Sequence, residues 1–278
     1  MNTETDKVVV PEYHSPEKYS GVFTVKKRKG GDRLIVATPF LFGKWAKTPA
    51  ERCNLRSEVM GARAASANPF WKDLVVRLTP ISGSLAVARR WKPVTSSDIG
   101  PLSELTDHYL GRAIGGPLIP IATSLNATQV IRDIAPKRYR EELIRLVGTA
   151  GVPFTGMHGD FHPYNFVRGR SGELLLTDWE HFDSDGSFAF DFMNFFLSQQ
   201  RWQTGENFLE FLTNLTTSAA AIAHAAQQLR APQNALLIYY TVMRLEIMFC
   251  RLGRSPADIG KKRYLQYLRV MDKLCAES

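Results

Sequence analysis

The pattern of apolar and polar positions changes about a third of the way along the chain. Short apolar runs rich in β-branched and aromatic residues predict strands at 22–25, 34–36, 40–42, 74–76 and 85–88. A Gly30-Gly31 turn between the first two runs is typical of a β-hairpin. Thr48-Pro49-x-Glu51 predicts the start of a helix that runs to about Ser66. The first 90 residues therefore predict a small, mainly antiparallel sheet with one helix.

Beyond residue 92 the pattern is mostly helical. A turn-like segment at 89–97 marks a boundary between two units, residues 1–92 and residues 93–278. Helices are expected near 101–114, 136–150, 187–200, 205–229, 233–252 and 256–275. Two short strands are expected within 165–178. We therefore expect an α+β fold made of a small β-rich unit and a larger, mainly helical one.

The composition is that of a folded, globular protein. Of 278 residues, 44% are hydrophobic and 22% are charged, which excludes disorder over most of the length. Three widely spaced cysteines form no disulfide framework and fit a reducing compartment. The first ten residues lack a signal-peptide pattern, and the most apolar later stretch, 235–250, contains two charged residues. We expect a cytoplasmic protein without a membrane span.

The net charge of +8 is unevenly distributed. Residues 1–90 hold 16 Lys and Arg against 8 Asp and Glu, whereas residues 91–278 hold 19 of each. A basic unit can bind phosphate groups, including those of a nucleic acid. A solvated basic face without a partner is the commoner explanation, so nucleic acid is not among the expected partners.

The residues that can carry chemistry lie between 158 and 180. Gly159 permits a tight turn and Pro163 prevents a continuing helix, so Asp160 is expected in a loop. A hairpin turn at 168–172 then brings Asp178 back beside Asn165. Oxygen ligands of this kind suit Mg²⁺ bridged to nucleotide phosphates, and a further carboxylate can orient or deprotonate a hydroxyl.

These residues resemble a known family. The pattern H-G-D-x-x-x-x-N at 158–165, followed 13 residues after the Asn by D-W-E at 178–180, resembles the aminoglycoside phosphotransferase and choline kinase-like family. Phe190-Asp191-Phe192 resembles a further aspartate of that family. The resemblance implies a two-lobed protein-kinase-like fold, with an N-lobe at 1–92 and a C-lobe at 93–278. It also implies transfer of the γ-phosphoryl group of ATP or GTP to a hydroxyl of a small molecule.

The resemblance implies roles for three residues of the C-lobe. Asp160 is expected to act as the catalytic base, and to contribute more by aligning the acceptor hydroxyl than by removing its proton. Asn165 and Asp178 are the expected Mg²⁺ ligands. ATP is the expected co-substrate.

Three further residues are expected to support these groups. Asp191 is expected to anchor the backbone of the catalytic loop, and His158 to pack beneath it. Glu180 lies close to the expected metal and is assigned indirect contacts with it.

The match is weaker in the N-lobe. A phosphate-binding loop could lie at Gly21 or at Gly30-Gly31, and neither makes a recognisable fingerprint. Lys44 is the candidate for the phosphate-binding lysine because it follows a strand, and Lys47 is its competitor. Glu58, in the middle of the expected helix, is the candidate partner of that lysine. An exposed lysine and an exposed helix acid are the alternative, which leaves open a catalytically weak kinase-like pseudoenzyme or binding scaffold.

Two other short motifs resemble metal sites. His158, Asp160 and His162 form an H-x-D-x-H string, which could belong to a zinc hydrolase, but the other histidines are isolated in the sequence. Asp183-x-Asp185-Gly186 resembles part of a calcium loop and lacks the closing Glu. It is expected to form a turn instead.

The charge of the last helices bears on the acceptor. Residues 192–278 carry ten Lys and Arg against six Asp and Glu. Acidic residues would be expected around a polycationic acceptor, because opposite charges attract and hold it. The sequence therefore favours a neutral or acidic sugar-like or amino-alcohol acceptor over an aminoglycoside.

Overall fold

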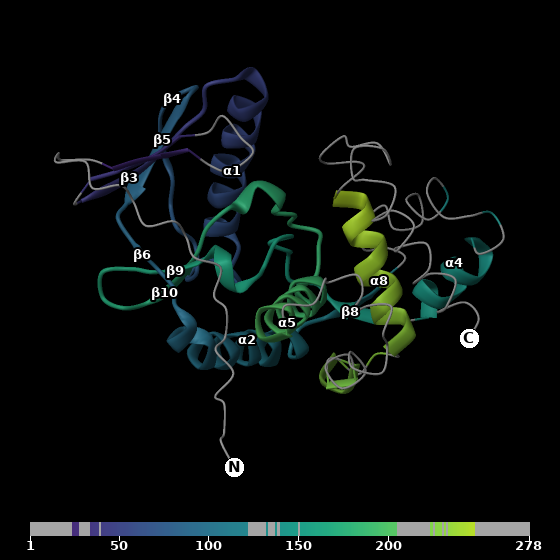
Figure 1. Ribbon diagram of the computed structural model, residues 1–278. Coiled ribbons are helices and arrows are strands. Elements are labelled where there is room, and N and C mark those ends of the chain that lie inside the picture. Colours follow the sequence, from purple (N-terminus) through teal and green to yellow (C-terminus); the bar gives the residue numbers. More distant parts are fainter. Residues whose placement is uncertain are drawn as a thin grey trace, which may run out of the picture.

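The computed structural model describes residues 24–27, 34–38, 40–121, 132, 137, 140–149, 151–204, 223–224, 226–229, 231 and 233–247. The chain forms a small lobe built on a sheet and a larger lobe built mainly of helices (Figure 1). In Figure 1 the sheet and helix α1 occupy the upper left, and the other helices lie below and to the right. The α+β fold expected from the sequence is confirmed.

The N-lobe holds a five-stranded antiparallel sheet. Its strands, in the spatial order β1-β2-β3-β5-β4, are β1 Thr24–Lys27, β2 Leu34–Ala37, β3 Leu41–Trp45, β5 Leu85–Arg89 and β4 Thr79–Ser82. The β1–β2 hairpin has the register Val25 opposite Val36. The predicted strands at 34–36, 40–42 and 85–88 are confirmed. The residues of the predicted Gly30-Gly31 turn lie outside the described ranges.

Helix α1 (Pro49–Ala67) begins as its sequence predicts. The Thr48 hydroxyl accepts a hydrogen bond from the backbone N–H of Glu51 at 3.3 Å, with Pro49 in the first turn. Its buried residues recur every three or four positions. They are Leu55, Glu58, Ala62 and Ala65.

One face of α1 packs tightly on a short 3₁₀ turn of the C-lobe, η4 (Trp179–His181). A Cβ atom placed on Gly61 would lie 1.9 Å from the carbonyl oxygen of Trp179. No side chain fits at that distance, so glycine is required for this helix to approach the segment that follows Asp178.

The predictions about strands need three corrections. The run at 74–76 is not a strand of the sheet. Its three residues are buried where the chain passes into the C-lobe, and there Val75 forms an isolated parallel bridge with Leu176. Strand β4 was not predicted, since all four of its residues are exposed and lack an alternating pattern. Strand β6 (Lys92–Pro93) was also missed. It pairs with β9 of the C-lobe, so the predicted boundary at residue 92 falls inside it.

The C-lobe combines helices with short strands. The helices are α2 Ile99–Ile114, α4 Arg140–Thr149, α5 Phe188–Thr204 and α8 Gln233–Glu246, with 3₁₀ turns η1 Ser96–Asp98 and η3 Pro163–Asn165. The strands are β9 Phe166–Arg168 and β10 Leu174–Leu176 beside β6, and the pair β7 Leu118–Pro120 and β8 Gly151–Pro153. The predicted hairpin around 168–172 and the helices beginning near 101, 187 and 233 are confirmed. The helix predicted at 256–275 and most of the one at 205–229 lie outside the described ranges.

An aromatic core underlies the loop at 158–165. Its fully buried rings come from α5, from the loop itself, from η4 and from the chain after α1; they include Trp71, Phe161, Trp179, Phe188, Phe190, Phe192 and Phe195. The α5 aromatics therefore serve as core packing. Burial of so many large rings makes the floor of the loop rigid.

No helix in the part of the chain that the structure describes is long and apolar enough to cross a membrane.

Candidate active site

The backbone of the loop at 158–165 is held from below by Asp191, in the first turn of α5. One carboxylate oxygen of Asp191 accepts from the N–H of His158 at 2.6 Å, and the other from the N–H of Gly159 at 2.9 Å. Burial raises the pKa of Asp191 well above its ordinary value, although both N–H donors act in the opposite direction. Gly159 has φ +85°, and a Cβ there would lie 2.7 Å from His181. The loop is thus fixed by one buried carboxyl group and one obligatory glycine.

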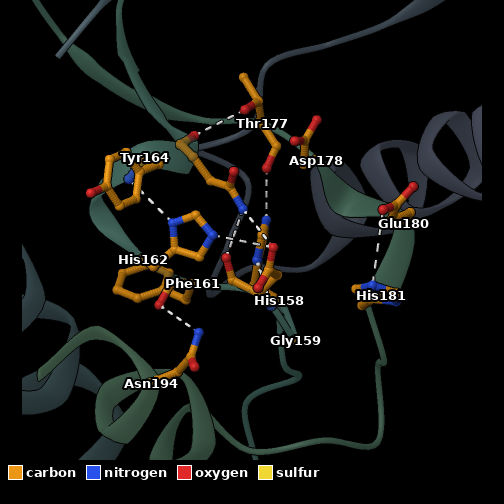
Figure 2. A network of polar contacts seen from close by, with 12 residues as sticks. His158, Gly159, Phe161, His162, Tyr164, Thr177, Asp178, Glu180, His181 and Asn194 are labelled. Carbon is orange, nitrogen blue, oxygen red and sulfur yellow. Dashed lines mark hydrogen bonds and ion pairs between the residues drawn. The ribbon is translucent and has the colours of Figure 1, made fainter. Parts of the chain in front are cut away.

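The ring of His158 joins this loop to the chain that precedes Asp178. Its Nδ1 accepts from the N–H of Asp160 at 3.1 Å, and its Nε2 lies 2.8 Å from the carbonyl oxygen of Thr177 (Figure 2). The proton must therefore sit on Nε2. Burial lowers the pKa of His158 to about 4, so the ring is neutral at pH 7. This histidine has the structural position expected from the sequence.

Asp160 lies at the exposed end of the loop, with about a third of its side chain accessible. Its Oδ2 accepts from Asn165 Nδ2 at 3.0 Å and lies 3.3 Å from His162 Nε2, while Arg244 Nη1 is 3.9 Å from its Oδ1. Burial alone would raise the pKa of Asp160, but His162 and Arg244 bring it well below its ordinary value. Asp160 is therefore an ionised carboxylate at neutral pH.

The β9–β10 hairpin brings Asn165 and Asp178 together, as the sequence predicts. Thr177 donates from its backbone N–H and from its hydroxyl to the carbonyl oxygen of Asn165, at 2.9 and 3.0 Å. The Asn165 side chain donates from Nδ2 to the backbone and side chain of Asp160, which directs its amide oxygen away from that residue. Figure 2 places Asp178 beside Thr177.

Asp178 has an unusual backbone. At φ 60° and ψ 52° it is the one non-glycine residue with a positive φ in the described part of the chain. Side chains other than Asn and Asp rarely adopt this conformation, and it recurs at functional sites.

Lys44 joins the two lobes at this point. It lies within β3, not after it as expected, and its Nζ contacts the carboxylates of both Glu58 on α1 and Asp178. Lys44 is 5% exposed and Glu58 is 1% exposed, which excludes the exposed-surface alternative for this pair. Burial would lower the pKa of Lys44, but the two carboxylates outweigh it and raise the pKa, so the lysine is charged. Its competitor, Lys47, is exposed.

Two site residues were missed or misassigned from the sequence. His162, whose place in the H-x-D-x-H string suggests a zinc ligand, lies against Asp160. No group of three His, Cys, Asp or Glu suited to a metal is found among the described residues. Arg244 is one of the two charged residues in the apolar stretch 235–250. That charge, within an otherwise buried helix, was the available signal for a site residue.

Glu180 stands two residues after Asp178, in η4. Its carboxylate lies 3.9 Å from His181 Nε2 (Figure 2). The candidate phosphate loops at Gly21 and Gly30-Gly31 lie outside the described ranges.

Together, the sheet-bearing lobe, the helical lobe and the residues where they meet define a two-lobed protein-kinase-like fold. Among solved structures, the choline kinase LicA from Streptococcus pneumoniae matches with a TM-score of 0.51 and 14% identity, over 90% of this chain and 94% of that one. LicA in complex with AMP matches with a TM-score of 0.53 and 15% identity, over 90% and 92%. The aminoglycoside phosphotransferase APH(4)-Ia matches at 0.49 and 13%, over 91% and 93%.

No family model matches this sequence, and no curated protein matches it. At identities of 15% or less, the likeness to LicA establishes the fold and leaves the reaction to be argued from the site.

Proposed function

We propose that the protein is a Mg²⁺-dependent phosphotransferase that moves the γ-phosphoryl group of ATP or GTP to a hydroxyl of a small molecule. The observation that carries the proposal is the buried Lys44, which contacts Glu58 in its own lobe and Asp178 in the other. Removing these three charges from water costs free energy, so a buried group of this kind is weak evidence for a purely stabilising role and points to a function. Binding the phosphates of a nucleotide is such a function.

In this proposal Lys44 binds the phosphates of the nucleotide and Glu58 holds the lysine in place. The three charges of Lys44, Glu58 and Asp178 sum to −1, which a divalent cation arriving with the nucleotide would offset. The structure of LicA with AMP supports a nucleotide site in this fold.

The residues at the expected metal site have the right chemistry for Mg²⁺. Asp178 offers a carboxylate that is 23% exposed, and Asn165 offers an amide oxygen. Mg²⁺ is commonly held by one or two protein oxygens, with the remaining ligands supplied by phosphates and water. The ion would neutralise charge on the phosphates when bound. Asn165 and Asp178 would set its position relative to Lys44.

Asp160 is assigned to the acceptor hydroxyl. Its lowered pKa makes it a poor proton acceptor in the ground state and a strong hydrogen-bond acceptor at every physiological pH. A loose phosphoryl-transfer transition state requires an aligned hydroxyl more than a fully deprotonated one. Asp160, held by Asn165 and His162, would supply that alignment.

The burial of Lys44 and Glu58 also bears on the pseudoenzyme alternative. That alternative rested on the weak N-lobe match, of which one part was that both residues could be solvated, and they are buried and paired. We therefore favour an active kinase over a binding scaffold. The acceptor is proposed to be a neutral or acidic sugar-like or amino-alcohol compound.

The proposal is tested by nucleotide-dependent thermal stabilisation, with and without Mg²⁺, followed by an acceptor screen that measures ADP release. We expect ATP to raise the unfolding temperature more with Mg²⁺ than without it. Asp178→Asn should abolish the difference, and Asp185→Asn, at an exposed carboxylate of the following turn, should preserve it. A wild-type protein that binds no nucleotide under either condition would refute the proposal.

A further inference from the structure

Helix α8 of the C-lobe is fixed against the catalytic loop by a chain of hydrogen bonds. The hydroxyl of Tyr240 donates to Asn194 Oδ1 at 3.1 Å, and Asn194 Nδ2 donates to the carbonyl oxygen of Phe161 at 3.1 Å. Phe161 directly follows Asp160. All three side chains are at most 3% exposed, so this connection is a built part of the core.

Arg244 lies four residues after Tyr240 and therefore on the same face of α8. That face places its guanidinium beside Asp160, with Nη1 3.9 Å from Oδ1. The distance is that of an ion pair and is too long for a hydrogen bond. About a quarter of the Arg244 side chain is exposed, and about a third of the Asp160 side chain is.

We propose that Arg244 binds an anionic group, a carboxylate or a phosphate, on the acceptor whose hydroxyl Asp160 aligns. The inference rests on the kinase function proposed above and names the substrate class. A hydroxyl aligned by Asp160 lies within about 3 Å of that carboxylate. The neighbouring atoms of a small acceptor then lie within reach of the guanidinium, whose planar fork matches a carboxylate or a phosphate.

The charges around Asp160 agree with this class of acceptor. The groups that lower the pKa of Asp160 through their charges are His162, Arg244 and His158, and each of them is cationic when it is charged. The acidic group whose charge interacts with Asp160 is Asp191, which is buried beneath the loop and turned towards its backbone N–H groups. An ammonium group on the acceptor would be repelled by the fixed guanidinium. Glu246, two residues beyond Arg244, does not share its face of the helix.

The test uses matched acceptors and the full-length protein. Glycerate, glycerol and choline form one set, and gluconate, glucose and glucosamine form another, each with an anionic, a neutral and a cationic member. ADP release with Mg²⁺ and ATP gives kcat and KM for each. We expect the anionic member to be the best acceptor of at least one set.

Arg244→Met should raise KM for that anion by about 10- to 100-fold, the range expected when a charged hydrogen-bonding partner is removed. The neutral member should be affected by a smaller factor, because it has no anionic group for Arg244 to bind. Arg244→Lys, which keeps the positive charge and loses the planar guanidinium, should give a KM for the anion between those of the wild type and Arg244→Met. Arg63→Met, at an exposed arginine on α1, is the matched control and should leave all values unchanged.

The proposal is overturned if no anionic member is used better than its neutral counterpart, or if Arg244→Met slows all members equally. The second outcome would mean that Arg244 positions Asp160 and does not contact the acceptor. Thermal unfolding of each variant excludes misfolding as the cause. Mg²⁺-dependent thermal stabilisation by ATP distinguishes failure of this inference from failure of the kinase function. If the stabilisation persists while anionic acceptors are rejected, this inference fails and the kinase function stands. If the stabilisation is absent, both fail.

Discussion

The two lobes assemble their parts of the site in different ways. In the C-lobe, the site residues from His158 to Asp191 lie within one short stretch of chain, and the β9–β10 hairpin brings Asn165 and Asp178 together. In the N-lobe, Lys44 and Glu58 stand on separate elements, and the second carboxylate that contacts Lys44, that of Asp178, is 134 residues away from it. The C-lobe therefore carries local information about its chemistry. The N-lobe acquires its chemistry through packing against the other lobe.

The strongest test of this contrast removes the acceptor side of the C-lobe alone. Asp160→Asn should lower kcat by about 10²- to 10⁴-fold, the usual range for a group that handles the proton of a nucleophile. Nucleotide binding, measured by calorimetry, should be unchanged because Asp160 does not contact Lys44 or Asp178 in the proposed arrangement. Asp107→Asn, at an exposed position on α2, is the matched control. An equal loss of nucleotide affinity would show that the two halves of the site are not separable.

The second test removes the charge that joins the lobes. Lys44→Met would leave Glu58 and Asp178 facing one another without a cation, and would remove a charged contact to phosphate. We expect nucleotide affinity to fall by about 10- to 100-fold, corresponding to about 1.5–3 kcal/mol. Lys47→Met alters an exposed lysine three residues away and should bind nucleotide normally. If the Lys47 variant were the weaker binder, our choice of lysine would be wrong.

The third test disrupts the packing of α1 of the N-lobe on η4 of the C-lobe. Gly61→Ala would place a methyl carbon 1.9 Å from the Trp179 carbonyl oxygen, so α1 must shift away from η4. We expect the free energy of unfolding to fall by about 1–3 kcal/mol, with a loss of nucleotide affinity as Glu58 moves. Gly111→Ala on α2, where nothing lies within 4 Å, should instead stabilise the protein by up to about 1 kcal/mol. Urea unfolding measures both, and equal effects would contradict the close contact.

The smallest expected effect is a pH dependence of stability that arises at His158. Its folded-state pKa of about 4 is below the ordinary value of 6.5, so the unfolded chain binds the proton more readily. Stability is therefore complete above pH 6.5 and is lost as the pH falls towards 4. The loss should be about 1 kcal/mol between pH 7.5 and pH 5.5.

Urea unfolding at the two pH values measures this loss. His158→Gln should remove that part of the pH dependence, at the cost of lower stability at pH 7.5. His108→Gln changes an exposed histidine and should keep it. An unaltered pH dependence in the His158 variant would assign the effect to other groups.

The sequence predicted the C-lobe site well because its geometry is set by short-range features. Gly159, Pro163 and the hairpin turn at 168–172 determine where the chain bends. The helix at 49–67 was equally clear, because the Thr48 cap and Pro49 signal its start locally. Each of these signals acts within a few residues of the structure it produces.

Features that depend on distant contacts could not be predicted in this way. The run at 74–76 has the composition of a strand, but contacts with Leu176 give it a single bridge. Arg244 reaches Asp160 because α8 packs on α5 through Tyr240 and Asn194, which no local pattern records. For the same reason, the sequence leaves the burial of Lys44 and Glu58 open, because the packing of the two lobes against each other determines it.

The left-handed backbone of Asp178 restricts what can replace it during evolution. The position must supply an oxygen ligand in the proposed reaction, and its residue must also tolerate φ 60°. Glycine meets the second demand without the first, and Asp178→Glu would keep the charge in a backbone conformation that longer side chains rarely adopt. Asparagine tolerates the backbone but offers an uncharged oxygen, whereas aspartate also supplies the charge that the proposed Mg²⁺ site uses. We therefore expect homologues that keep the proposed reaction to retain aspartate at this position, even where the surrounding β9–β10 hairpin has diverged.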